Sequence, residues 1–138
     1  MDFVLLDEEC KPMRVSNQDA GFDLRSSIDV KIYPGEHRVV PLGVAISIPE
    51  GMFGLLTHRS SLAFKHGCII STGIIDSSFT SEIKALVINL AEEEIPLVIS
   101  KGDRIAQLIL IDHNPYIRLN QVKSIEVGKE GFGSTGVR

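Results

Sequence analysis

With 138 residues, a hydrophobic fraction of 43% and a charged fraction of 23%, the chain has the size and balance of one globular domain that buries a core of its own. Its formal net charge of −4 argues against general affinity for nucleic acid, which needs clustered Lys and Arg, but is compatible with a local basic pocket for a small anion. Cys10 and Cys68 form no CxxC pair, and no long apolar run occurs near Met1. We therefore expect an intracellular protein without a disulfide scaffold, a zinc site or a membrane partner.

Apolar residues recur with a period of two rather than 3.6, which indicates strands. In IDVKIYPG every second residue from Ile28 is apolar, and the turn pair Pro34-Gly35 then ends the strand. Further strands are predicted within the ranges 44–48, 82–90, 95–100 and 104–112. Turn signals at short intervals are typical of a sandwich or barrel, so the predicted fold class is all-β, in one domain.

One short helix is expected in SLAFKHG, residues 61–67, with Ser60 or Ser61 as its cap. No other segment keeps a helical period for three turns.

The last twelve residues, 127–138, are rich in glycine and contain one large apolar residue, Phe132. The glycines of GFGSTG have the spacing of a dinucleotide-binding fingerprint, but that motif needs a helix after its last glycine, and only two residues follow here. Two interpretations stay open: a frayed terminus, or an arm that becomes ordered over a ligand. We divide the chain into a β domain, 1–126, and a C-terminal arm, 127–138.

Four other stretches interrupt the strand pattern with polar residues: DAGFDLRSS, HRSSLA, STGIIDSSF and GDRIAQLIL. Taken singly, Asp23 can stabilise a turn, Asp76 can end a hairpin and Gln107 can lie on a strand edge. Taken together, these residues indicate one site that binds a nucleotide and its phosphates and activates a water. Arg59 beside two hydroxyls suits a polyphosphate, because a guanidinium offers paired donors, and Asp76 can act as a general base for water. Phe132 on a glycine-rich arm can stack on a base.

The segments AGFDLRS, RSSLA, GIIDSSF, GDRIAQLI and GFGSTG resemble, in order and spacing, the five motifs of the homotrimeric dUTPase family. They span residues 20–136, almost the whole chain. The resemblance implies a jelly-roll-like β-sandwich or barrel of the dUTPase type that assembles around a threefold axis. In such a homotrimer each active site draws on three chains, and the C-terminal arm of one closes a site between two others.

The resemblance also implies a reaction, the hydrolysis of dUTP to dUMP and pyrophosphate. Mg²⁺ would bind mainly through the triphosphate and water. Asp76 would hold and activate the attacking water, and Asp23 would contact the metal indirectly, through water. The phosphate contacts implied are Arg59, Ser60, Ser61 and Gln107 in the body and Ser134 and Thr135 in the arm.

The base and sugar contacts fall in the hairpin STGIIDSSF. Its backbone would read the uracil edge at Ser71, Thr72, Gly73 and Ile74, and Phe79 would pack on the deoxyribose. Cytosine presents the opposite donor and acceptor pattern and would leave buried backbone groups unpaired, at about 1–3 kcal/mol each. The substrate-binding set is completed by Lys84 and, in the arm, by Gly131, Phe132, Gly133, Ser134 and Thr135.

The chain also departs from the family pattern. Val127 stands where the arm usually carries an arginine for the γ-phosphate, and Lys129 is the hypothetical replacement. In the hairpin Phe79 replaces a tyrosine, and Thr80 and Ser81 replace an arginine and a glycine. These departures favour one alternative to an active dUTPase, a nucleotide-binding or regulatory protein of the same fold with reduced catalysis. Two others stay open: a member of the related dCTP deaminase branch and a β-sandwich adhesion module.

Overall fold

The computed structural model describes residues 1–126 and 128 and contains strands, one 3₁₀ turn and one short helix. The helical elements are η1 (Glu8–Cys10) and α1 (Ser60–His66). The strands are β1 (Asp2–Leu5), β2 (Gly21–Arg25), β3 (Val30–Ile32), β4 (His37–Pro41), β5 (Val44–Ser47), β6 (Met52–His58), β7 (Cys68–Ile70), β8 (Gly73–Ile75), β9 (Lys84–Asn89), β10 (Leu97–Ile99) and β11 (Arg104–Asp112). The all-β prediction is confirmed.

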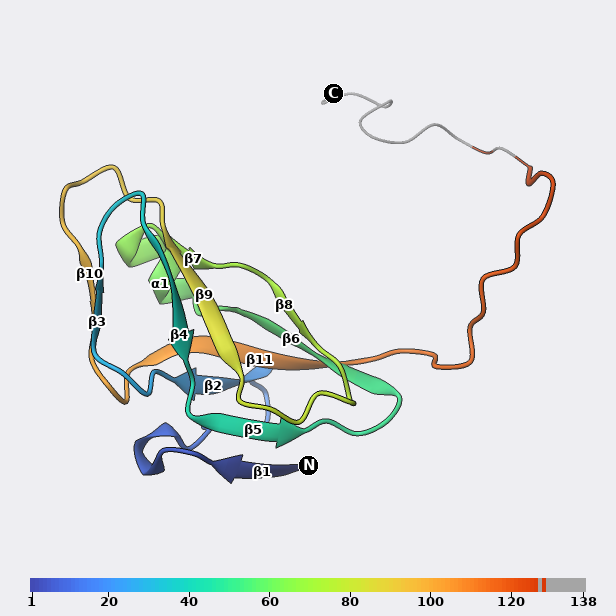
Figure 1. Cartoon of the computed structure of the whole chain (residues 1–138), viewed down its shortest axis with the longest axis horizontal. Coiled ribbons are helices and arrows are strands. Elements are labelled where there is room, and N and C mark those ends of the chain that lie inside the picture. Colours follow the sequence, from blue (N-terminus) through green and yellow to red (C-terminus); the bar gives the residue numbers. More distant parts are fainter. Residues whose placement is uncertain (127, 129–138) are drawn as a thin grey trace.

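All strand pairs within the described residues are antiparallel, and they form four sheets. The largest has the order β2-β11-β6-β8, and a three-stranded sheet has the order β4-β9-β7 (Figure 1). The pairs β1-β5 and β3-β10 complete the body. The long strand β11 lies between β2 and β6, so residues far apart in the sequence meet along it.

One apolar core joins these sheets, because alternate residues of the central strands point inward. Leu24, Leu56 and Leu108 come from the four-stranded sheet and are at most 1% exposed, while Val40 and Val87 come from the three-stranded sheet and are fully buried. Burying a side chain of this kind contributes about 1.5–3 kcal/mol. Burial of these side chains therefore fixes the position of the backbone at the ends of the strands.

The buried residues with polar or reactive side chains are Ser26, Asn89, Cys10 and Cys68. Asn89 is 1% exposed, and its Nδ2 donates to the carbonyl of Ile32 at 2.8 Å while its Oδ1 accepts from the amide of Ala91 at 2.9 Å. Cys10 and Cys68 are free and buried, and burial raises the pKa of both thiols. Both thiols are therefore less reactive than an exposed cysteine.

The predicted strands and the turn at Gly35, where φ is +83°, are confirmed, but two local details were wrong. The helix α1 starts at Ser60 with Arg59 in the N-cap position, and no side chain caps it, so neither serine is the cap. The segment 71–79 is not a hairpin of two mutually bonded strands. Only β8 lies within this segment. It pairs with β6, whereas its neighbours along the chain, β7 and β9, pair with each other in another sheet.

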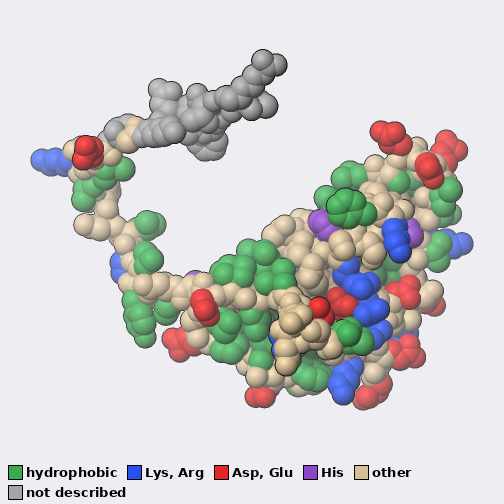
Figure 2. All heavy atoms as spheres, turned by 180° about the vertical axis from the view of Figure 1, so that it is seen from behind, with side chains coloured by type: hydrophobic (Ala, Val, Ile, Leu, Met, Phe, Trp, Pro, Cys, Tyr) green, Lys and Arg blue, Asp and Glu red, His purple; other side chains and the backbone are tan. Residues whose placement is uncertain are grey.

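After β11 the chain leaves the body as an extension, residues 113–126, with no strand or helix assigned (Figure 1). Five apolar side chains on it are more than half exposed: Tyr116, Ile117, Leu119, Val122 and Ile125. Hydrophobic side chains are visible along this extension in Figure 2. The predicted arm, 127–138, lies outside the described residues apart from Gly128. Within the described part of the chain, no helix has the length and apolar character needed to cross a membrane.

Candidate active site

A polar cleft of about 310 Å³ lies where β2, β6 and β11 meet the start of α1. Strand β11 creates it, because Gln107 pairs with Asp23 of β2 on one side and with Thr57 of β6 on the other. The next residues after β6 are Arg59 and the first turn of α1. The lining residues are Asp19, Ala20, Gly21, Asp23, Arg59, Ser60, Ser61 and Gln107. The structure thus brings together Arg59, Ser60, Ser61 and Gln107, while the other two predicted phosphate contacts, Ser134 and Thr135, lie outside the described residues.

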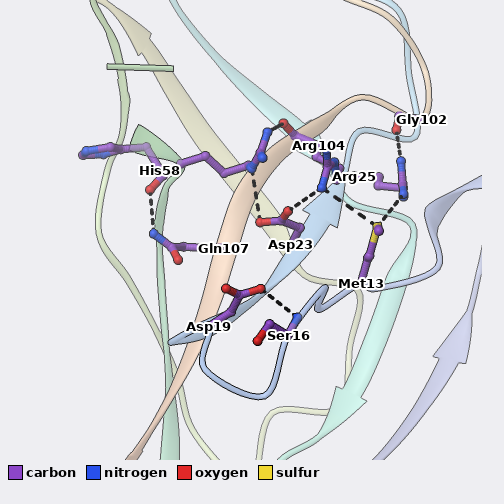
Figure 3. Close-up of polar contacts among 10 residues, drawn as sticks. Met13, Ser16, Asp19, Asp23, Arg25, His58, Gly102, Arg104 and Gln107 are labelled. Carbon is purple, nitrogen blue, oxygen red and sulfur yellow. Dashed lines mark hydrogen bonds and ion pairs between the residues drawn. The ribbon is translucent and has the colours of Figure 1, made fainter. Parts of the chain in front are cut away.

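Asp23 holds two arginines at this cleft (Figure 3). Its Oδ1 lies 3.1 Å from Nε of Arg59, and its Oδ2 lies 3.1 Å from Nη1 of Arg104. Nη1 of Arg59 also donates to the carbonyl of Arg104 at 3.2 Å. These contacts fix the plane of the Arg59 guanidinium, which is the property that directional phosphate binding requires.

Gln107 is oriented by a backbone group. Its Nε2 donates to the carbonyl of His58 at 3.2 Å, which leaves the amide oxygen and one N–H for a ligand in the cleft (Figure 3). The imidazole Nδ1 of His58 is buried and has no hydrogen-bond partner among the described residues. The pairing of β6 with β11 places His58 beside Gln107, and this hydrogen bond fixes the direction of the Gln107 side chain.

Two residues of this region were missed by sequence reasoning. Asp19 lines the cleft from a turn in which its Oδ2 accepts from the amide of Ser16 at 3.0 Å. Arg104 was quoted within GDRIAQLIL but received no role, because its pairing with Asp23 depends on strand register. The DAGFD segment offered the only signal for Asp19, a second carboxylate four residues before Asp23.

The remaining predicted residues lie elsewhere on the chain. Phe79 and Lys84 line a second hollow, of about 420 Å³, that shares no residue with the polar cleft. Asp76 is exposed directly after β8, and its carbonyl accepts from the amide of Phe79 at 3.0 Å. Ser71, Thr72 and Ile74 are exposed and Gly73 is half-buried. Gly131, Phe132, Gly133, Ser134 and Thr135 lie outside the described residues.

Fold and cleft together define a class: a small all-β protein with an arginine- and hydroxyl-lined cleft at the edge of its main sheet. The dUTPase family profile matches residues 8–136 of the chain. The deoxyuridine 5'-triphosphate nucleotidohydrolase of Corynebacterium jeikeium is 42% identical over 143 aligned positions, covering 97% of this chain and 91% of that protein. The enzyme of the same name from Corynebacterium glutamicum is 39% identical, with 96% and 92% covered.

The similar solved structures are also dUTPases. A Staphylococcus bacteriophage 80alpha dUTPase with dUpNHpp superimposes with a TM-score of 0.86 at 32% identity, over 99% of this chain and 98% of that one. The dUTPase from phage phi11 of S. aureus gives a TM-score of 0.82 at 31% identity, with 91% and 97% covered. The chain belongs to the dUTPase family. The predicted family and fold class are confirmed, and the dCTP deaminase and adhesion alternatives are not supported.

Proposed function

We propose that this chain hydrolyses dUTP to dUMP and pyrophosphate in a Mg²⁺-dependent reaction. The observation that carries the proposal is the cleft in which Arg59, Ser60, Ser61 and Gln107 meet, in a chain of the dUTPase family. Relatives that are about 40% identical over most of their length bear the name deoxyuridine 5'-triphosphate nucleotidohydrolase, and a similar phage dUTPase was solved with dUpNHpp.

The phosphate chain lies in this cleft in our proposal. Arg59, held by Asp23, presents its free N–H groups to phosphate oxygens, and the hydroxyls of Ser60 and Ser61 donate shorter hydrogen bonds. Gln107 contacts the α-phosphate with the N–H that His58 leaves free. Such preorganised donors stabilise the charge that develops as the bond to phosphorus breaks, because they need no reorientation during the reaction.

Asp76 is the proposed general base. Its exposed carboxylate, directly after β8, takes a proton from the water that attacks the α-phosphorus, and the bond to the pyrophosphate leaving group breaks. The backbone from Ser71 to Ile74 reads uracil, and Phe79 covers the deoxyribose, with Lys84 beside it in the same hollow. The arm, with Phe132, closes over the base.

The residues present fit a magnesium ion that arrives with the nucleotide. No group of three or more His, Cys, Asp or Glu side chains gathers as a metal site among the described residues, so the chain by itself offers no full ligand cage. Asp19 and Asp23 provide carboxylates at the phosphate cleft, and hard oxygen ligands suit Mg²⁺, which keeps several waters. When bound, the ion would neutralise phosphate charge.

We further propose a homotrimer in which the active site is shared. Two features support this. The predicted residues of one chain line two hollows without a common residue, which is the arrangement that a site shared between copies would leave in a single chain. The extension 113–126 also exposes Tyr116, Ile117 and Leu119, and contact with a neighbouring subunit would remove this apolar surface from water.

The alternative is a nucleotide-binding or regulatory protein with reduced catalysis. The observations that favour it are Val127 in the arm and Thr80 and Ser81 beside Phe79, where the family pattern has charged residues or glycine. In the described structure Thr80 and Ser81 are exposed. Thr80 stands where the family pattern has an arginine and carries no positive charge.

Pyrophosphate release from dUTP tests the proposal. The purified protein with Mg²⁺ is expected to turn over dUTP and to leave dCTP and dTTP intact. Asp76→Asn is expected to lower kcat at least about 100-fold, the usual contribution of a general base, with little change in KM. Glu50→Gln, in an exposed turn, is the matched control. Binding of a non-hydrolysable dUTP analogue without turnover would replace the enzyme with the regulatory alternative.

A further inference from the structure

We infer that the end of the body formed by α1 and the loop 90–96 is a docking surface for a different protein, one whose docking segment carries an apolar side chain next to Lys or Arg residues. The surface consists of Phe64, the loop 90–96 and a hollow lined by both α1 and the loop. It shares no residue with the polar cleft or with the hollow that contains Phe79. The inference therefore does not depend on the proposed reaction.

Exposed apolar side chains surround the hollow at this end. The loop 90–96, which joins β9 to β10, lies beside α1 at the end of the body away from the extension 113–126 (Figure 1). Ile95 is 67% exposed, Leu90 at the start of the loop is 61% exposed, and Phe64 of α1 is 90% exposed. Apolar side chains that gather at a hollow and stay in contact with water are typical of an interaction site. The hollow, of about 210 Å³, is lined by Lys65, His66, Ala91, Glu93, Ile95, Pro96 and Leu97.

Hydrogen bonds fix the backbone of the loop. The buried side chain of Asn89 donates to the carbonyl of Ile32 at 2.8 Å and accepts from the amide of Ala91 at 2.9 Å. The amide of Leu90 donates to the carbonyl of Gly67 at 3.0 Å and so ties the loop to the end of α1. A Cβ added at Gly67 would lie 3.2 Å from Cα of Ala91, which shows how closely the two segments pack. A surface held in this way loses little conformational entropy when a partner binds.

The rim of the hollow is acidic. Glu92, Glu93 and Glu94 are consecutive and exposed, and none of them forms an ion pair with a described residue. Among the residues that line the hollow, Lys65 alone carries a positive charge when His66 is neutral. Figure 2 shows acidic side chains next to hydrophobic ones at this end of the body. Carboxylates beside an apolar hollow complement a segment in which Lys or Arg residues flank an apolar side chain.

Size and charge decide which occupant fits. The hollow is smaller than typical small-molecule pockets, which measure roughly 300–1,000 Å³, so it suits a single side chain of a protein. A second copy that used the same surface would place the three glutamates against their own equivalents, because a twofold contact is self-complementary, and like charges repel. The phosphates of nucleic acid would be repelled in the same way. The occupant that fits both size and charge is a basic and apolar segment of a different protein.

Fluorescence anisotropy of the full-length protein with a labelled probe tests the inference. The probe is a short peptide with one leucine between two pairs of lysines. The triple variant Glu92→Gln, Glu93→Gln, Glu94→Gln is expected to bind it about tenfold more weakly, because three exposed charge contacts are lost. Ile95→Ser removes the exposed apolar side chain at the hollow and is also expected to weaken binding about tenfold. Glu50→Gln removes an exposed charge elsewhere and is expected to match the wild type.

Two further measurements locate the probe and separate the possible occupants. Amide NMR shifts are expected to change for residues 63–67 and 90–97, and a probe with glutamates in place of the lysines is expected not to bind. Light scattering is expected to give the same mass for the wild type and the variants. A lysine probe that does not bind, or that binds the triple variant and Ile95→Ser as tightly as the wild type, overturns the inference. A different mass for the variants also overturns it, because the surface would then contact another copy of this chain.

Discussion

The arginine pair at the phosphate cleft is expected to depend on the charge of Asp23, and Asp23→Asn measures this. A hydrogen bond to a charged group contributes about 1.5–3 kcal/mol when shielded from water. Here the side chains of Asp23, Arg59 and Arg104 are 20%, 28% and 34% exposed, so solvent screening reduces each contact. Asparagine keeps the shape and one acceptor. We expect Asp23→Asn to lower the free energy of unfolding by about 1–2 kcal/mol.

Urea unfolding at a fixed protein concentration provides the measurement, because the proposed homotrimer would make the stability depend on concentration. Combining Asp23→Asn with Arg104→Gln completes a double-mutant cycle, and the expected coupling is about 1 kcal/mol. KM for dUTP is expected to rise in Asp23→Asn, since Arg59 loses its fixed orientation. If the single variant unfolds within about 0.3 kcal/mol of wild type and the cycle is additive, the two ion pairs contribute nothing and the reasoning fails.

Two further predictions concern the body. Gly43 has φ +63° and an added Cβ would lie 2.7 Å from Sγ of Cys10, so Gly43→Ala is expected to cost about 2–4 kcal/mol in urea unfolding. Gly35→Ala, with φ +83° and open space around it, should show only the smaller backbone part; equal losses would contradict the steric argument. The hydrogen bond from Lys101 Nζ to Asp7 Oδ2, at 2.8 Å, holds the pKa of Asp7 below its ordinary 3.8. A lowered carboxyl pKa stabilises the fold above that ordinary value and ceases to do so as the pH falls through the folded-state pKa. Lys101→Gln should therefore lower Tm near neutral pH and leave it unchanged in strong acid, and an equal loss at both would refute the assignment.

Strands were predictable from the sequence because a half-buried strand imposes its period on the residues. In β9 the buried positions are Ala85, Val87 and Asn89, and the residues between them are only partly buried, which is the alternation expected. The short helix was also predictable from its turn and polar boundaries. The residue at its N-cap was not predictable. Arg59 takes that position, and its side chain lies in the cleft and does not cap the helix.

Strand register was not predictable, and the pairing at the site depends on it. The sequence shows Asp23 and Arg104 separated by 81 residues, and only the pairing of β2 with β11 brings them within 3.1 Å. The same limit applies to the segment 71–79. Its turn residues suggested a hairpin, while the structure gives β7 and β8 to different sheets, since each finds a longer partner strand there.

The five motifs are spread over residues 20–136, and their residues fall into separate parts of the folded chain. One group, Arg59, Ser60, Ser61 and Gln107, is assembled by β11 within a single chain. Phe79 and Lys84 belong to another hollow of that chain, and the extension that leads to the arm runs away from the body with apolar side chains uncovered. Folding of one chain therefore forms the cleft that contains Arg59 and Gln107, and in the proposed homotrimer the residues for base recognition would come from another copy. Variants of the cleft should act on each chain separately, and variants of the extension 113–126 should act on assembly and activity together.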